Sequence, residues 1–269
     1  MFKQLKVLAV AAVMALAAGS LTACSGDDGA VKIGIKFDQP GLGQQVGNSY
    51  EGFDIDVANF VAKELGYESV EFVETPSAQR ETMLQSDQVK MIFATYSITD
   101  ERKEKVSFAG PYIIAGQDLL VRADATDING PEDLPGKRLC SVKGSTSAQN
   151  LNDKYGGQAQ LQEYDNYSKC VEALAAGNID VVSTDNTILY GFASQDQYKG
   201  KIKVVGETFS EERYGVGIKK GDTELCNKIN DALTKMVESG EWQAAADKYL
   251  GPAGFELGAD NPPTPDACS

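Results

Sequence analysis

The sequence predicts an α/β protein of two lobes, each with a mixed, mostly parallel sheet flanked by helices, and a cleft between them. Strand and helix patterns alternate from residue 31 onward, and the alternation begins again near residue 118. Such βαβ rhythms favour parallel sheets with helices on both faces. Of the 269 residues, the first 23 are typical of a leader, and the 246 that remain are enough for two lobes of ordinary size.

The first run contains three apolar segments separated by two helical patterns. Ile55, Phe60 and Leu65 recur at helical spacing, and Gly66 follows where that helix would end. The apolar segment at 31–37 is typical of a buried strand. In chain order, we expect a strand at 31–37, a helix at 55–65, a strand at 70–73, a short helix at 79–85 and a strand at 91–95.

The second run repeats this rhythm and leads into two longer helices. Pro131 begins a short helical turn, and a Gly144-Ser145-Thr146 segment separates a strand from the helix after it. Four of the nine prolines fall in residues 251–269, where we expect an extended tail. In chain order, we expect strands at 119–121 and 138–142, a helix ending at 151, a helix at 167–176, strands at 179–183, 201–205 and 215–219, and helices at 222–239 and 241–249.

The first 24 residues have the pattern of a secretory signal. A short basic start with Lys3 and Lys6 precedes an apolar run at 5–18, and Leu-Thr-Ala then leads to Cys24. That run is short for a membrane span, which needs ~20 residues. Leu-Thr-Ala-Cys resembles the bacterial lipobox, which implies cleavage before Cys24, a lipid on its thiol and a polar linker at 24–30. The alternative is an ordinary signal with an incidental cysteine.

Composition excludes several classes of function. The chain contains no histidine, which excludes Ser/His/Asp and Cys/His catalytic arrangements and removes the commonest metal ligand. We expect no metal site and no cofactor. The net charge of −14 argues against nucleic-acid binding, which needs clustered Lys and Arg.

The cysteines suggest two disulfides in an oxidising compartment. With Cys24 set aside, four remain, and four cysteines allow three pairings. Cys140 lies on an expected strand and Cys170 on a nearby expected helix, while Cys226 begins a helix and Cys268 ends the tail. We favour the pairs Cys140–Cys170 and Cys226–Cys268.

Four sequence blocks, in order, identify a resemblance to a known family. They are Gly-Phe-Asp-Ile-Asp-Val at 52–57, Thr-Tyr-Ser-Ile-Thr-Asp-Glu-Arg at 95–102, Gly-Ser-Thr at 144–146, and Asp180 followed by Asp185. The chain resembles the polar amino-acid solute-binding proteins, the extracellular receptors of ATP-driven importers. Within that family it looks most like the glutamate-binding lipoproteins. The resemblance covers essentially all of residues 31–250.

The resemblance implies a type II periplasmic-binding-protein-like fold. Lobe 1 would comprise residues 31–111 and 216–256, and lobe 2, inserted into it, residues 117–210. Two hinge strands near 112–116 and 211–215 would join them, and 257–269 would form the tail. Ligand would close the lobes over itself by hinge motion, and a monomer would suffice.

The resemblance also assigns the groups that hold the α-amino acid. Arg102 would bind the α-carboxylate, because a guanidinium matches a planar carboxylate. Thr95 and Ser97 would add hydroxyl or backbone donors. Ser145 and Thr146 would offer donors at a helix N-terminus, and Asp185 would accept from the ammonium. The plainer interpretations are a solvated surface charge for Arg102 and helix N-caps for Ser145 or Thr146 and for Asp185.

Lys36 and Arg80 would read the side chain of the ligand. An acidic protein must place local positive charge to hold an acidic side chain, and relatives that bind neutral ligands lack a cation at the position of Arg80. The plainer interpretations are a strand-end lysine and a helix-surface arginine.

These expectations combine into one functional hypothesis. The chain would be a lipid-anchored protein on the outer face of the cytoplasmic membrane that captures L-glutamate and delivers it to an ABC permease. Aspartate, glutamine and asparagine are further candidate ligands. One alternative is an amino-acid-sensing receptor of the same fold. Another is a lyase such as a cyclohexadienyl dehydratase, but the absence of histidine disfavours an enzyme.

Overall fold

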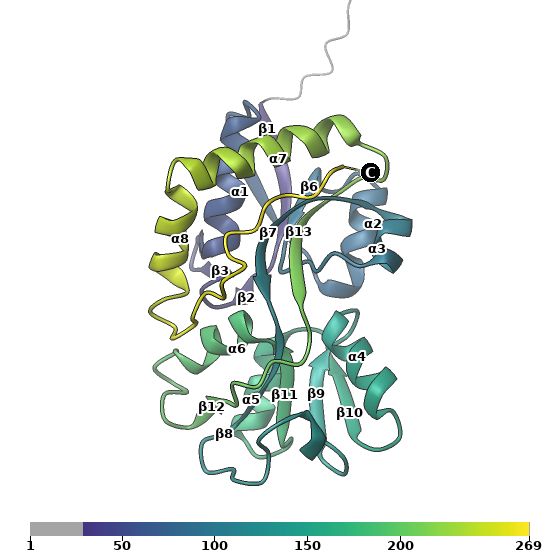
Figure 1. Cartoon of the computed structure of the whole chain (residues 1–269), viewed down its shortest axis with the longest axis vertical. Helices are drawn as coiled ribbons and strands as arrows, with labels where there is room; N and C mark the ends of the chain where they lie inside the picture. The colour runs from purple at the N-terminus through teal and green to yellow at the C-terminus, as the bar shows by residue number, and fades with distance from the viewer. Residues whose placement is uncertain (1–28, 269) are drawn as a thin grey trace, which may run out of the picture.

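The computed structural model describes residues 29–268, which fold into two α/β lobes joined end to end (Figure 1). Two mixed sheets, one in each lobe, confirm the predicted fold class. Lobe 1 is built on strands β1 (Ala30–Ile35), β5 (Ser69–Glu74), β6 (Met91–Phe93), β7 (Ser107–Ala115) and β13 (Glu212–Ile218). Lobe 2 is built on β8 (Gln117–Arg122), β9 (Arg138–Val142), β10 (Gln160–Tyr164), β11 (Val181–Asp185) and β12 (Ile202–Val204).

The two sheets share one arrangement of strands. Their orders are β5-β1-β6-β13-β7 and β10-β9-β11-β8-β12. In each, the first three strands are parallel, and the fourth is antiparallel to both of its neighbours. That fourth strand, β13 or β8, is the one whose chain arrives from the other lobe. The carboxyl ends of the parallel strands therefore face the boundary between the lobes.

Helices cover both faces of each sheet. In lobe 1, α1, α7 and α8 pack against one another on one side, while α2 and α3 lie on the other (Figure 1). The bounds in lobe 1 are α1 (Phe53–Glu64), α2 (Arg80–Gln85), α3 (Asp100–Lys105), α7 (Thr223–Glu238) and α8 (Glu241–Tyr249), with a 3-10 turn at Ser77–Gln79. In lobe 2 they are α4 (Thr146–Tyr155), α5 (Tyr167–Ala175) and α6 (Asn186–Ala193), with a 3-10 turn at Pro131–Asp133.

Several elements differ from the sequence-based prediction. The strand expected at 91–95 ends at Phe93, because Thr95 takes a left-handed φ of 45° that no strand accommodates. The strand expected at 179–183 spans 181–185, and α4 continues to Tyr155 instead of ending at 151. The elements with no predicted counterpart are α3, β10 and the part of β7 that precedes the predicted hinge strand at 112–116. The small sheet of β2 (Asp38–Gln39), β3 (Gly43–Val46) and β4 (Ser49–Glu51) was not predicted either.

The chain crosses between the lobes through two strands that pair with each other. Glu212, Arg213 and Tyr214 lie opposite Ala115, Ile114 and Ile113, so β7 and β13 form an antiparallel ribbon that leads to the boundary. Gly116 alone separates β7 from β8. A paired ribbon with a one-residue link limits the lobes to bending or twisting about a narrow axis.

The C-terminal segment covers the outer edge of this ribbon. The Asn261 side chain donates to the carbonyl of Ile114 and accepts from its N–H, both at 2.9 Å, as a neighbouring strand would. Arg213 forms an ion pair with Asp266 at 2.9 Å. Figure 1 shows this yellow segment beside β7. The edge of β7, which would otherwise offer unpaired backbone groups, is thereby covered.

Both predicted disulfides are present. Cys140–Cys170 joins β9 to α5, and Cys226–Cys268 joins α7 to the end of the tail, closing segments separated by 30 and 42 residues. Among residues 29–268, no helix has the length and apolar character needed to cross a membrane. The signal at 1–23 and the lipidation of Cys24 concern residues outside the described range.

Candidate functional site

The predicted ligand-binding residues come together where the two lobes meet. Lys36 follows β1 and Thr95 follows β6 in lobe 1, while Gly144 follows β9 and Asp185 ends β11 in lobe 2. Ligands of open α/β sheets bind at the carboxyl ends of parallel strands. Here two such edges face each other, so both lobes contribute to one site.

Two arginines from lobe 1 converge on a single carbonyl of lobe 2. Arg80 begins α2, and Arg102 lies in α3. The Nη2 atom of Arg80 donates to the Gly144 carbonyl at 3.3 Å, and Nη2 of Arg102 donates to the same oxygen at 3.1 Å. Both guanidinium groups lie over the Tyr96 ring, with carbon-to-centroid distances of 4.0 and 5.0 Å. Tyr96 thus packs the two cations side by side.

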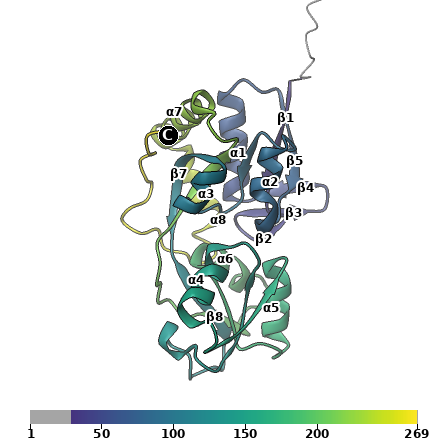
Figure 2. The ribbon, with the colours of Figure 1, turned by 90° about the vertical axis from the view of Figure 1, so that its right-hand side faces the viewer.

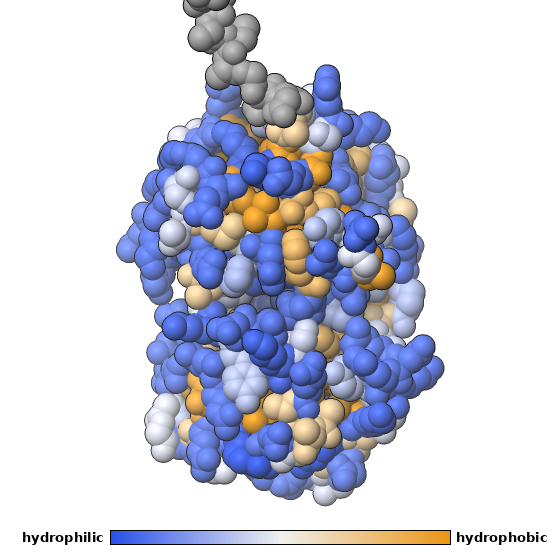
Figure 3. All heavy atoms as spheres, turned by 180° about the vertical axis from the view of Figure 1, so that it is seen from behind, coloured by the Kyte–Doolittle hydropathy of each residue, from blue (hydrophilic) through white to orange (hydrophobic). Residues whose placement is uncertain are grey.

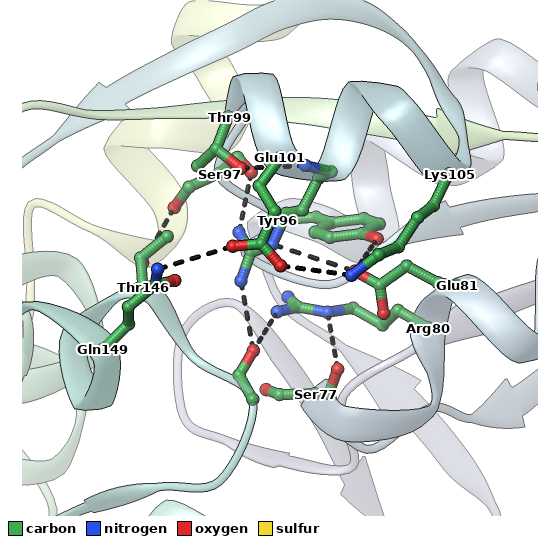
Figure 4. A network of polar contacts seen from close by, with 12 residues as sticks. Ser77, Arg80, Glu81, Tyr96, Ser97, Thr99, Glu101, Lys105, Thr146 and Gln149 are labelled. Atoms are coloured by element: carbon green, nitrogen blue, oxygen red, sulfur yellow. Dashed lines mark hydrogen bonds and ion pairs between the residues drawn. The ribbon is translucent and has the colours of Figure 1, made fainter.

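Arg80 uses most of its donors within lobe 1. Its Nε donates to the Ser77 carbonyl at 3.3 Å (Figure 4). Its Nη1 donates to the carbonyls of Ala94 and Thr95 at 3.1 and 3.4 Å. Burial, and then the charge of Arg102, lowers its pKa to about 10. The plainer interpretation of Arg80 as a surface arginine is wrong, because the side chain is only 2% exposed.

Arg102 is held by both lobes and by one acid. Its Nη1 donates to the Ser97 carbonyl at 2.7 Å, and its Nε lies 3.8 Å from a Glu81 carboxylate oxygen. Glu81 also accepts from the Tyr96 hydroxyl at 2.6 Å (Figure 4). At 8% exposure, Arg102 is not a solvated surface charge.

Lys36 adds a third buried cation on the same side. Its ammonium donates to the Ser77 hydroxyl at 2.8 Å, next to the carbonyl that Arg80 contacts. Burial, and then the charge of Arg80, lowers the pKa of Lys36 well below its ordinary value. Burying three cations close together costs free energy, and such a cluster is the usual sign of a site for anions.

Thr95 and Ser97 shape the site in different ways. The Thr95 N–H donates to the Asp54 carboxylate at 3.0 Å, and its hydroxyl lies 3.2 Å from the Gln39 side-chain oxygen. These contacts hold Thr95 in its left-handed conformation and turn its carbonyl toward Arg80. The Ser97 hydroxyl lies 3.5 Å from the Thr146 hydroxyl of lobe 2.

The segment after β9 places a helix N-terminus against lobe 1. Ser145 is the N-cap of α4 and accepts from the Ala148 N–H at 3.0 Å, so the capping interpretation of this residue is correct. Gly144 has a φ of 78°, and a Cβ on it would lie 2.7 Å from the Cα of Ala78. Only glycine allows this backbone to approach lobe 1 so closely.

Asp185 presents a buried carboxylate from lobe 2. It occupies the N-cap position of α6, as the capping interpretation expects, but its side chain makes no capping hydrogen bond. The Tyr214 hydroxyl donates to one oxygen at 2.6 Å, and the Ser147 hydroxyl donates to the other at 3.3 Å. Burial, and then the negative charge of Glu212, raises the pKa of Asp185 to about 7.

Glu212 is a residue of the candidate site that the sequence analysis missed. It lies on β13 at 3% exposure and accepts from Thr146 at 2.9 Å and from Ser210 at 2.8 Å. Period-two alternation was the available signal, since it places Glu212 on the same face of the hinge strand as Tyr214. Without knowing where the hinge strand begins, the sequence alone does not distinguish Glu212 from its neighbour Glu211.

Two hollows of very different volume lie beside these groups at the boundary between the lobes. A hollow of about 480 Å³ is lined by Arg102, Glu101 and Lys105 of lobe 1 and by Lys143, Ser145 and Gln149 of lobe 2, among others. A smaller one of about 60 Å³ lies beside Lys36 and Tyr167. Figure 2 shows α3 above α4 across this waist, and Figure 3 shows hydrophilic side chains along it from behind.

Comparisons with known proteins agree with this geometry. Residues 31–252 match the family described as bacterial extracellular solute-binding proteins, family 3. The glutamate-binding protein GluB of Corynebacterium glutamicum is 46% identical over 270 residues, covering 91% of this chain and 90% of that protein.

Two solved structures show the same fold. One is an ancestral arginine-binding protein bound to glutamine, with a TM-score of 0.77, 36% identity, and coverage of 83% of this chain and 98% of the other. Another is an ancestral amino-acid-binding protein described as a precursor of cyclohexadienyl dehydratase, with a TM-score of 0.75, 31% identity, and coverage of 83% and 96%. The two-lobed fold, the four sequence blocks and the match over 31–252 lead to one conclusion: the chain belongs to family 3 of the bacterial extracellular solute-binding proteins, and it is an amino-acid-binding member.

Proposed function

We propose that this protein captures L-glutamate between its lobes as the binding component of an ABC importer. One observation carries the proposal: the cations Lys36, Arg80 and Arg102 of lobe 1 are buried at the same lobe boundary as the carboxylates Asp185 and Glu212, and the charge of Arg102 acts on Asp185. Glutamate carries two carboxylates and one ammonium group, which is the complementary pattern. A buried charge is costly unless it is paired, so such a site favours a ligand that supplies both signs.

Each group has a role that follows from its position. Arg102 binds the α-carboxylate, with the hydroxyls of Ser97 and Thr146 beside it, because these three lie together at the lobe boundary. Asp185 accepts from the ammonium, and the nearby charge of Glu212 strengthens the negative potential there.

The remaining cations read the side chain of the ligand. Arg80 and Lys36 flank Ser77 and supply positive charge for the γ-carboxylate. A glutamine side chain lacks that charge and gains less from them. Thr95 and Ser145 complete the lining as the residues that orient Arg80 and the start of α4.

Capture depends on closing the lobes about the β7–β13 ribbon. The contacts of Arg80 and Arg102 with Gly144 are made between lobes, so they form and break as the lobes close and open. In the proposed cycle, the closed protein docks as a monomer on a membrane permease and releases the amino acid on reopening. A lipid on Cys24 keeps it at the outer face of the cytoplasmic membrane.

We further propose that binding is not followed by a reaction. The carboxyl of Asp185, with its pKa near 7, is the group best suited to acid–base work, and one structural relative is described as a precursor of a dehydratase. In a capture protein this carboxylate is occupied by the ammonium of the ligand and moves no proton to a carbon or oxygen atom.

A thermal-shift panel tests the proposal. The mature domain should be stabilised by L-glutamate more than by any other common amino acid, since only a bound ligand shifts the unfolding equilibrium. Chromatography of the same samples should recover glutamate unchanged. A larger shift with a basic or apolar amino acid, or any product, would reject the assignment.

A further inference from the structure

A second contact between the lobes lies on the other side of the β7–β13 ribbon from the contacts of Arg80 and Arg102 with Gly144. It is made by residues 38–40 of lobe 1, which we call the clasp, against α5 and α6 of lobe 2. In Figure 1, β2 and α6 lie on one side of the β7–β13 ribbon, whereas α3 and α4 lie on the other. Figure 2 shows β2 directly above α5. The arginine contacts and the clasp therefore bridge the lobes at two separate places.

One half of this contact is a carboxylate at a helix N-terminus. The Oδ2 atom of Asp38 accepts from the Ser168 N–H at 3.1 Å and from the Ser168 hydroxyl at 2.9 Å. Ser168 is the second residue of α5, so its N–H is among those that the helix itself leaves unpaired. A carboxylate at this position also meets the positive end of the helix dipole.

The other half is a backbone approach that only glycine permits. A Cβ on Gly191, in the middle of α6, would lie 2.1 Å from the carbonyl oxygen of Pro40. Real side chains do not approach a carbonyl so closely, so any side chain at Gly191 must push the lobes apart at this point. The conformation of Gly191 is helical, which means that alanine would suit α6 itself better than glycine does.

Hydrogen bonds fix the clasp in its place on lobe 1. The Gln39 side-chain oxygen accepts from the Thr95 hydroxyl at 3.2 Å, and the Gln39 carbonyl accepts from the Leu42 N–H at 3.1 Å. The residue after the clasp, Gly41, is tied to the start of α1, because its carbonyl accepts from the Phe53 N–H at 3.0 Å. Displacing the clasp would disturb the start of α1.

We propose that the clasp holds the lobes closed without reading the ligand, and so sets how long an amino acid stays bound. The proposal rests on the proposed function in taking L-glutamate as the ligand. Closure contacts that touch no ligand shift the balance between open and closed protein, and the apparent affinity for every ligand changes by that same factor.

The decisive variant is Gly191→Ala. Calorimetry and stopped-flow dissociation, each with L-glutamate and L-glutamine, should show both ligands weakened by the same factor of roughly 10 or more, chiefly through faster release. The melting temperature of the ligand-free variant should not fall, because alanine favours the helix. Unchanged affinity, or an altered ratio between the two ligands, would overturn the proposal.

Two matched controls and a second variant complete the test. Ser168→Ala removes the hydroxyl donor to Asp38 but keeps the N–H, and both ligands should weaken by a common, smaller factor of about 3- to 30-fold. Gly258→Ala makes the same change as Gly191→Ala where a Cβ meets nothing within 4 Å, and Glu51→Ala removes an exposed acid from the same small sheet. Neither control should change affinity, and a loss equal to that of Gly191→Ala would overturn the proposal.

A measurement without ligand separates this proposal from the proposed function. If the wild-type protein binds neither glutamate nor glutamine, the proposed function fails, but small-angle X-ray scattering of the ligand-free proteins still tests the clasp. The Gly191→Ala protein should have a larger radius of gyration than the wild type, because its lobes are held apart. Identical scattering profiles in that case would overturn the clasp as well.

Discussion

Replacing Arg80 with methionine separates the structural role of this side chain from its proposed role in reading the ligand. Arg80 donates to four backbone carbonyls, those of Ser77, Ala94, Thr95 and Gly144, and the first three belong to lobe 1. Methionine fills much of the same volume but donates nothing. The variant therefore loses the cation that we propose to face the ligand, and it leaves buried carbonyls of lobe 1 without this donor.

The two losses have different magnitudes and different readouts. An orphaned buried carbonyl costs about 1–3 kcal/mol, and neighbouring groups relax together, so we expect the free energy of unfolding to fall by about 2–4 kcal/mol. At 2–4 °C per kcal/mol for a protein of this size, the melting temperature should fall by roughly 5–15 °C. A charged hydrogen bond contributes ~1.5–3 kcal/mol, so glutamate should bind roughly 10- to 150-fold more weakly.

The ratio between glutamate and glutamine is the informative quantity. Both ligands suffer equally from a destabilised lobe 1, but only glutamate loses a charge partner, so calorimetric titrations should show the ratio shrinking by about tenfold. Arg138→Met is the matched control, because Arg138 also donates to two carbonyls, of Asn178 and Gly177, but lies on the far side of lobe 2 and pairs with Asp180. Equal weakening of both ligands in the Arg80 variant would refute the role of Arg80 in reading the side chain.

Two further predictions concern the same site, and a third concerns the proposed lipid anchor. Arg102→Ala should weaken every amino-acid ligand by ~2–5 kcal/mol, because all share the α-carboxylate, and retained micromolar affinity in calorimetry would remove Arg102 from the site. Asp185→Asn should abolish amino-acid binding yet raise the melting temperature of the ligand-free protein at pH 8. The sign follows from the raised pKa: the folded protein binds the Asp185 proton more tightly than the unfolded chain, so its stability falls as the pH rises from about 4 to about 7, and the amide removes this fall. A wild-type pH profile of melting temperature that Asp185→Asn leaves unchanged would contradict this. Cys24→Ser should release the protein from cell membranes into the medium with unchanged glutamate affinity, and continued membrane association would mean that the leader itself is the anchor.

The sequence predicted well the elements whose pattern is local. The apolar spacing of Ile55, Phe60 and Leu65 located α1 to within two residues, and the cysteine positions led to the correct disulfides. The predicted strand at 91–95 was too long because the left-handed Thr95 depends on its contact with Asp54, far away in sequence. Strand β10 was missed because it is a polar, mostly exposed edge strand without apolar alternation.

The sequence predicted which residues belong to the candidate site but not the contacts that they make with one another. The family resemblance brought Arg80, Arg102 and Asp185 into one hypothesis, and all three lie at the lobe boundary. That both arginines share the Gly144 carbonyl, and that Glu212 stands near Asp185, depends on how the lobes meet. Such contacts join segments more than 25 residues apart in the chain, and local patterns carry no information about them.

Titration of the wild-type mature domain with L-glutamate at pH 7.5 tests the central claim most directly. With three cations and the carboxylates of Asp185 and Glu212 buried at one lobe boundary, the protein should bind the dicarboxylic amino acid with micromolar affinity, about −8 kcal/mol, and more tightly than glutamine or arginine. If glutamate gives no heat while arginine or glutamine does, the cation cluster is not a reader of acidic side chains and the proposed function is wrong.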